Sequence, residues 1–241
     1  PERLEQVWSH YRYCFWTQTR DQSKNAYHYL SGLLRMNIAR NFKEIGRIAG
    51  VPQGRIQHFM SESPWEAQQV SRQVQADIRA TEALEGGALL LDESADAKAG
   101  LESAGAARQY NGRLGKVDRS QVGVFLTYVK GDIWTWIDGE LFLPEAWFTA
   151  GYAERRRQVG IPEQRQFQTK VELGWAMVQR TQTNQVPFEF LACDDLYGRA
   201  TWFRAQLAEA AISYMADVPS DTLVYREKPE WGIPPTPPEH R

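Results

Sequence analysis

The spacing of apolar positions divides the chain into a helical first part and a second part in which strand and helix patterns alternate. Residues 1–85 carry apolar side chains at helical intervals, with breaks at 50–52 and at Ser63-Pro64. Residues 86–228 mix strand-like runs with helical ones, and residues 229–241 hold five of the 12 prolines. We therefore expect an all-α region at 1–85, an α/β domain at 86–228, and a proline-rich tail or linker at 229–241.

The second part predicts its strands and helices in a definite order. An apolar run at 88–91 predicts a buried strand that ends in Asp92 and Glu93, and Gly131-Asp132 between two apolar runs predicts a β-hairpin of 121–130 and 133–143. The remaining expected elements are a helix at 164–180, a strand at 188–193, a helix at 197–211, and strands at 212–216 and 222–225. This order predicts an α/β fold with an RNase H-like mixed sheet flanked by helices.

The two strand-end acids form the candidate catalytic site. In an RNase H-like sheet the first and fourth strands lie side by side, so Asp92 and Asp194 are expected to meet. Two neighbouring carboxylates repel each other and are stable as anions mainly when a divalent cation neutralises them. We therefore predict that Asp92 and Asp194 bind Mg²⁺ or Mn²⁺ and act on a phosphodiester. The alternative is that each is an ordinary helix cap or turn residue.

Residues 42–61 predict a helix-turn-helix. Small residues stand at Gly46 and Gly50, where two crossing helices need close approach and a turn. The apolar positions of a shared core are Ile45, Ala49, Val51, Ile56 and Phe59. Asn41 and Glu44 resemble a capping box at the start of the first helix. The side chains expected to face DNA are Arg47, Gln53, Arg55, Gln57 and His58. An ordinary helical hairpin that binds nothing is the alternative.

Charge and composition sharpen this division. The net charge of -2 over 241 residues hides six basic groups against one acid at 24–60, and eight acids against three basic groups at 64–104. The first block fits a polyanion partner, and the second fits a cation site or a solvated face. Two cysteines exclude a disulfide framework and a cysteine zinc site. No apolar run reaches the ~18 residues of a membrane span, and no signal-peptide pattern is present, so we expect a cytoplasmic protein.

The residues from 91 onward resemble a block in bacterial insertion-sequence transposases of the DDE superfamily. The motifs that carry the resemblance are Asp92, Lys98-x-Gly100, Gln109-Tyr110-x-Gly112-x-x-Gly115-Lys116, the run at 121–124, Leu143-Pro144-Glu145-x-Trp147, Thr169-Lys170-x-Glu172 and Asp194-x-x-Tyr197-Gly198. Together with Gln57-His58-Phe59 and Ser63-Pro64-Trp65, they extend over nearly the whole chain in the same order and spacing.

This resemblance implies a metal-dependent transposase. Such an enzyme binds double-stranded DNA at transposon ends, cuts phosphodiesters with two Mg²⁺ ions and joins the freed 3′ end to target DNA. Asp92 and Asp194 match the first two catalytic acids of the family, and we expect Lys98 and Lys116 to contact phosphates near the metals. The resemblance further implies a homodimer that acts in the cytoplasm, at the nucleoid, without a membrane partner.

Two departures from the family pattern leave the function open. Glu93-Ser94-Ala95 stands where the family has a second Asp or a Thr-Gly, and Asp96 occupies a normally apolar position. The third acid of the family is a Glu on a helix expected beyond residue 241, so activity depends on whether that acid is supplied. Three hypotheses follow: a DDE transposase or its truncated portion, a non-catalytic DNA-binding regulator of the same descent, or a repurposed metal-dependent hydrolase.

Overall fold

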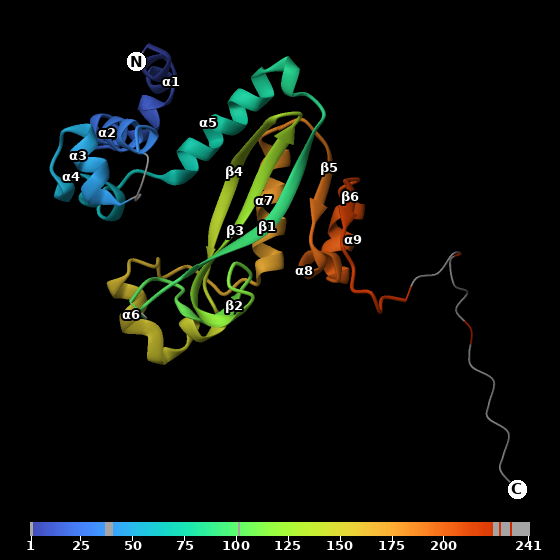
Figure 1. The fold of residues 1–241 in the computed structure, drawn as a ribbon. Coiled ribbons are helices and arrows are strands. Elements are labelled where there is room, and N and C mark those ends of the chain that lie inside the picture. The colour runs from blue at the N-terminus through green and yellow to red at the C-terminus, as the bar shows by residue number, and fades with distance from the viewer. Residues whose placement is uncertain (1, 37–40, 101, 224–226, 228–231, 233–241) are drawn as a thin grey trace, which may run out of the picture.

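The N-terminal part of the protein is a set of helices that leads into a central sheet (Figure 1). The computed structural model describes residues 2–36, 41–100, 102–223, 227 and 232. The first elements are α1 (Glu2–Tyr11), η1 (Arg12–Phe15), α2 (Ser23–Leu34), α3 (Phe42–Ala49), α4 (Gln53–Ser61), α5 (Ala67–Ala80) and η2 (Glu82–Leu84). The expected proline-rich tail at 229–241 lies outside the described residues apart from Gly232. No described helix has both the length and the apolar character that crossing a bilayer requires.

Helices α3 and α4 follow from local signals in the sequence. The Asn41 side chain accepts a hydrogen bond from the Glu44 backbone N–H at 2.9 Å and caps α3, while Gly50 adopts a left-handed φ of 73° that ends it. A Cβ at Gly46 would lie 2.7 Å from the Val51 carbonyl oxygen, so only glycine permits this approach. Pro52 precedes α4 as its N-cap residue.

The sheet has the mixed topology that the strand order predicts. Its strands are β1 (Gly87–Ala97), β2 (Ala107–Asn111), β3 (Lys116–Lys130), β4 (Ile133–Phe142), β5 (Phe188–Cys193) and β6 (Ser213–Ala216). The order is β2-β3-β1-β5-β6, and β4 also pairs with β3. Strand β1 runs antiparallel to β3 and parallel to β5. The later helical elements are η3 (Glu145–Phe148), η4 (Ala150–Tyr152), α6 (Ala153–Gln158), α7 (Lys170–Thr183), α8 (Asp195–Gly198) and α9 (Thr201–Glu209). The protein is therefore an RNase H-like α/β fold behind an all-α region.

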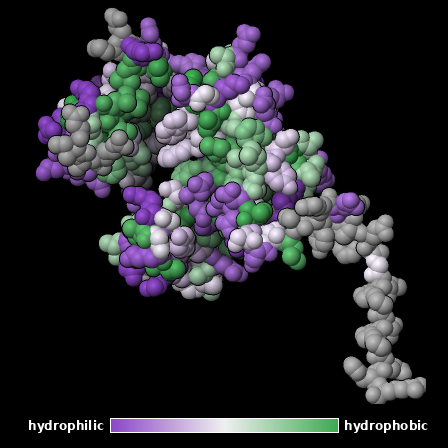
Figure 2. Space-filling model, turned by 45° about the vertical axis from the view of Figure 1, so that its right-hand side comes forward, coloured by the Kyte–Doolittle hydropathy of each residue, from purple (hydrophilic) through white to green (hydrophobic). Residues whose placement is uncertain are grey.

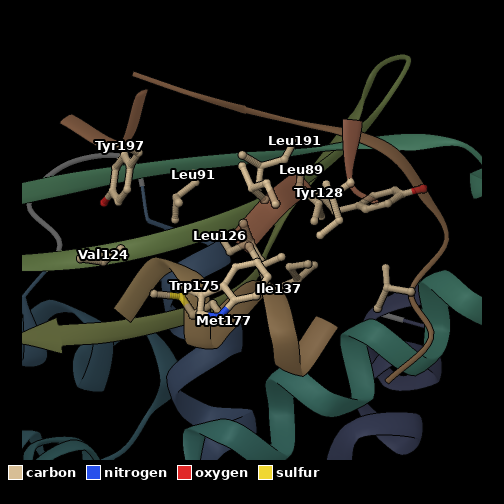
Figure 3. Packing of buried hydrophobic residues seen from close by; sticks show 14 of the residues in the cluster. Leu89, Leu91, Val124, Leu126, Tyr128, Ile137, Trp175, Met177, Leu191 and Tyr197 are labelled. Atoms are coloured by element: carbon tan, nitrogen blue, oxygen red, sulfur yellow. The ribbon is translucent and has the colours of Figure 1, made fainter. Parts of the chain in front are cut away.

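The hydrophobic core lies between one face of the sheet and helices α5, α7 and α9. Leu89 and Leu91 of β1 point to the same face as Leu126 of β3, because side chains alternate along a strand. Figure 3 shows these side chains directed toward Trp175 and Met177, both of α7. Burial of each large aliphatic side chain contributes about 1.5–3 kcal/mol. The core therefore aligns β1 with its neighbours and fixes where its acids emerge.

The opposite face of the sheet is open over the part of the chain that is described. Its exposed apolar side chains are Leu90, Trp134, Trp136 and Met215. Figure 2 shows hydrophobic surface across the strand-bearing part, bordered by hydrophilic atoms. Trp134 and Trp136 are 70% and 61% exposed, because helices α5, α7 and α9 all pack on the other face. Trp136 covers Phe125 at a centroid distance of 4.8 Å, whereas Trp147 is fully buried.

Several predicted element bounds are wrong for physical reasons. Strand β1 continues through its acids to Ala97, because the long β3 offers backbone partners along all of it. Strand β2 is polar and was not expected. Helix α7 begins only at Lys170, where Thr169 and Glu172 form a capping box. The helix expected at 197–211 is divided into α8 and α9. Of the strand expected at 222–225, residues 222 and 223 are irregular and the other two lie outside the described residues.

A β-bulge in β4 joins the sheet to α5 and α7. The register with β3 shifts at Ile137, so that Ile137 and Asp138 both face inward. Asp138 accepts hydrogen bonds from Arg180 Nε at 2.8 Å and from Gln68 Nε2 of α5 at 3.1 Å. Arg180 also pairs with Glu140 at 2.8 Å. The bulge thus sets an inward carboxylate at the junction of the helical region and the sheet.

Candidate active site

Asp92 and Asp194 emerge together where strands β1 and β5 stop pairing. The two strands run parallel and remain in register to Leu91 and Cys193, so the next residue of each chain is an aspartate. By strand alternation both side chains belong to the open face. Asp194 also caps α8 by accepting the Leu196 N–H at 3.1 Å. Both aspartates line one cavity of about 350 Å³, so the two sequence-predicted acids lie side by side.

The electrostatics of this cavity favour a cation. Burial raises the pKa of Asp194, and the negative charges of Glu93 and then Asp92 raise it further. The same kind of environment, burial first and then the charges of Asp194 and Asp217, raises the pKa of Cys193 to about 11. The Cys193 thiol is therefore protonated at neutral pH and acts as a packing residue rather than a nucleophile. Oxygen donors that crowd and repel in this way are those that Mg²⁺ and Mn²⁺ accept.

Glu93 connects the two acid-bearing elements and was not assigned a role from the sequence. It points to the opposite face from Asp92, where Lys170 Nζ of α7 pairs with its Oε1 at 2.7 Å. The hydroxyl of Tyr197, in α8, donates to its Oε2 at 3.3 Å. Tyr197 is fully buried, so this contact ties the turn that carries Asp194 to β1. The alternation of β1 beyond Leu91 is the signal that would have placed Glu93 inward.

Three residues of the β2–β3 hairpin line the same cavity and were assigned no role from the sequence, although two of them belong to a motif that carries the family resemblance. They are Tyr110 at the end of β2, and Gly112 and Arg113 in the turn at 112–115. Nothing in the local pattern marks β2 as a strand, since its residues are largely polar. The pairing of Tyr110 with Val117 of β3 brings this hairpin next to the acids.

The two predicted phosphate contacts, Lys98 and Lys116, lie outside the lining of the acid cavity. Lys98 Nζ pairs with Asp96 at 2.8 Å, and Lys116 Nζ pairs with Asp118 at 3.0 Å. Each lysine is therefore engaged by an acid two residues away. Their role as DNA contacts stays a prediction.

The predicted DNA-binding side chains of α4 are exposed on one short helix. They are Gln53, Arg55, Gln57 and His58. Between them Ile56 and Phe59 face inward and are fully buried or nearly so, which is why their polar neighbours face solvent. Arg47 of α3 is also exposed but pairs with Glu44 at 2.8 Å. None of these residues lines the acid cavity, so the structure presents two separate candidate surfaces.

The donor set for a metal is incomplete over the described part of the chain. There, no group of three or more His, Cys, Asp or Glu side chains is arranged to hold a metal ion. Asp92 and Asp194 supply two carboxylates, while Glu93 is engaged by Lys170. Mg²⁺ is commonly held by one or two carboxylates together with waters and substrate phosphates, and the pair fits that pattern.

Comparison with known proteins identifies the family of this chain. A family model described as DDE superfamily endonuclease matches residues 13–241. A relative from Microchaete diplosiphon, described as a probable transposase for insertion sequence element IS701, is 26% identical over 220 residues. That alignment covers 88% of this chain and 54% of the relative, so the chain spans about half the length of the curated relative it matches. No solved structure was found to match.

Proposed function

The chain belongs to the DDE superfamily endonucleases, and from this premise we propose that it is the DNA-binding and acid-bearing part of an insertion-sequence transposase. The proposal rests most heavily on Asp92 and Asp194, which end the paired lengths of two parallel strands and line one cavity. The similarity to a probable insertion-sequence transposase supports the same assignment. The substrate class is double-stranded DNA, both transposon ends and target DNA, and the working unit is a homodimer associated with the nucleoid.

Asp92 and Asp194 are the residues that would hold Mg²⁺ or Mn²⁺. A divalent cation held by these carboxylates would supply Lewis-acid stabilisation of the phosphodiester and would lower the pKa of a water or 3′-hydroxyl. Asp194 is held in place by its helix-cap hydrogen bond, and Glu93 steadies the same turn through Tyr197. The remaining ligands of such an ion would be substrate phosphate oxygens, waters or a further carboxylate.

Replacing Asp92 by Asn should lower the affinity for Mn²⁺ by about tenfold or more, because a neutral amide cannot balance the charge of the ion. The affinity is measured by isothermal titration calorimetry, together with the cleavage of a labelled DNA duplex in Mn²⁺. Asp96→Asn is the matched control, because Asp96 lies on the same strand, is exposed and pairs with Lys98. We expect its Mn²⁺ affinity to equal that of the unmodified protein.

Equal Mn²⁺ affinities for Asp92→Asn and Asp96→Asn would contradict the metal site. If the protein binds DNA but no Mn²⁺, the non-catalytic regulator becomes the better hypothesis. If it binds Mn²⁺ but does not bind DNA at low salt, the repurposed metal-dependent hydrolase becomes the better hypothesis, since phosphate contacts dominate DNA affinity under those conditions.

Arg55→Ala should weaken DNA binding in a salt-dependent manner. We propose that Arg55 contacts a phosphate from the exposed side of α4, where the net local charge is positive. Loss of one phosphate contact reduces the slope of log K against log salt by about 1. Fluorescence anisotropy with a labelled duplex at several salt concentrations measures this slope. Arg72→Ala on α5 is the control, and equal slopes for both variants would rule out the contact.

A further inference from the structure

We propose that the β2–β3 hairpin forms a nucleotide-binding wall opposite the acids, in which Arg113 binds a phosphate and Tyr110 stacks on an unpaired base. The ligand class is a DNA end whose terminal nucleotide is frayed or single-stranded. This inference rests on the proposed function, because it assumes that the Asp92 and Asp194 cavity receives DNA. It adds the residues that hold the substrate and the form of DNA that they accept.

The lining and the volume of the cavity suit a small part of a DNA substrate. One wall is the middle of β1 with Asp92, together with Asp194 directly after β5, and the other is the hairpin with Tyr110 and Arg113. A volume of about 350 Å³ is at the lower end of small-ligand sites and is far too small for a duplex. A single nucleotide with its phosphate is an object of the right size. We therefore infer that the terminal base leaves the helical stack when its nucleotide occupies this cavity.

The turn that carries Arg113 is held by hydrogen bonds of the buried Asn111 side chain. Asn111 is 1% exposed, and its Nδ2 donates to Ser120 Oγ at 2.9 Å. Its Oδ1 accepts the Leu114 N–H at 3.3 Å, which closes the turn. Gly115 has a left-handed φ of 64°, which glycine adopts without strain. Arg113 is thus presented from a defined loop rather than from a loose one.

Arg113 is the cation at the cavity that no acid engages in the described part of the chain. Lys170, the neighbouring cation of the site, is bound by Glu93. Over the described residues, the Arg113 side chain forms neither an ion pair nor a hydrogen bond, although it lines a cavity with three acids. A guanidinium binds phosphate oxygens in a bidentate manner, and a phosphate is the group that the acids and a metal would process.

Tyr110 supplies a flat apolar surface beside that cation. Its side chain lines the cavity and is 60% exposed, so its ring is available to a ligand. Unpaired bases stack on such rings whatever their sequence. Because Tyr110 and Arg113 are three residues apart across one hairpin end, a base and its own phosphate can contact both.

The test uses a short DNA duplex that ends in an unpaired 3′ 2-aminopurine nucleotide, with a blunt duplex for comparison, both in Ca²⁺. In the unmodified protein we expect quenching of the 2-aminopurine fluorescence and tighter binding of the tailed duplex. Tyr110→Leu should abolish the quenching, and Arg113→Ala should weaken binding of the tailed duplex by about tenfold. Arg113→Lys should recover part of that loss.

Arg108→Ala is the matched control, because Arg108 is exposed on the same strand and lies outside the cavity lining. The inference is overturned if Arg113→Ala and Arg108→Ala bind the tailed duplex with equal affinity. It is also overturned if the Tyr110→Leu protein still quenches the 2-aminopurine fluorescence. Mn²⁺ affinity is measured in parallel, so that failure of the nucleotide-binding wall can be distinguished from failure of the proposed function. If Mn²⁺ binds normally but the substitutions at Tyr110 and Arg113 do not change binding of the tailed duplex, only the nucleotide-binding wall is refuted. If the protein binds neither Mn²⁺ nor DNA, the proposed function is refuted as well.

Discussion

Replacing Arg180 by Met should lower the free energy of unfolding by about 3 kcal/mol. The change leaves the Asp138 carboxylate, which is 1% exposed, without its charged partner. Removing one member of a buried pair strands an uncompensated charge, which costs about 3–5 kcal/mol. Burial lowers the pKa of Arg180, but the hydrogen bonds and charges of Asp138 and Glu140 outweigh it and raise the pKa overall. We expect a loss at the lower end of this range of unfolding free energies, because the Arg180 side chain is itself 35% exposed.

The comparison is made by urea denaturation followed by circular dichroism. Arg157→Met on α6 is the control, because Arg157 and its partner Glu154 are both largely exposed and such pairs contribute about 0–1 kcal/mol. The double variant Asp138→Asn/Arg180→Met should lose less than the two single changes added together, because neither charge is then stranded. Equal losses for Arg180→Met and Arg157→Met would show that the pair does not hold α5 and α7 to the sheet.

Gly198→Ala should destabilise the protein by about 2–3 kcal/mol and weaken Mn²⁺ binding at the same time. A Cβ at Gly198 would collide with the Asp217 carbonyl oxygen, and this atom is backbone that a rotamer change cannot move. The Gly198 N–H donates to the Asp194 carbonyl at 2.9 Å, so any shift of Gly198 moves the turn that carries the acid. Denaturation and Mn²⁺ titration of the same sample measure both effects.

Gly54→Ala provides a control for which the expected change in stability has the opposite sign. Gly54 lies in α4, and a Cβ there meets no atom within 4 Å. Alanine in a helix is more stable than glycine by about 0.5–1 kcal/mol, so this variant should gain stability and bind Mn²⁺ normally. A Gly198→Ala protein that is as stable as the unmodified chain would show that α8 can move away from β6 at little cost.

The elements that sequence patterns placed correctly depend on neighbours within a few residues. Helix α3 begins after Asn41 and ends before Gly50, and Gly131 with Asp132 joins β3 to β4. Both could be predicted because helix caps and tight turns need particular residues at particular positions. Strand order alone was enough to bring Asp92 next to Asp194, since the topology of a mixed sheet allows few arrangements.

The features that patterns missed depend on partners far away in the chain. Polar residues after Asp92 argue against a strand, yet β1 continues to Ala97 because β3 supplies its hydrogen bonds. The bulge at Ile137 turns Asp138 inward only because α5 and α7 offer Gln68 and Arg180. Long-range pairing overrides local preference in such places.

The amino-acid order alone thus specified a helical region, a mixed sheet and two acids at neighbouring strands, since periodicity, caps and strand succession are written in local spacing. Folding in three dimensions assigned the surroundings of those acids. It paired Glu93 with Lys170 and paired Lys98 and Lys116 with other acids. It also brought Tyr110 and Arg113 to the cavity. The physical reason is that a cavity is made by side chains from several strands and turns, whose register and packing no single segment encodes.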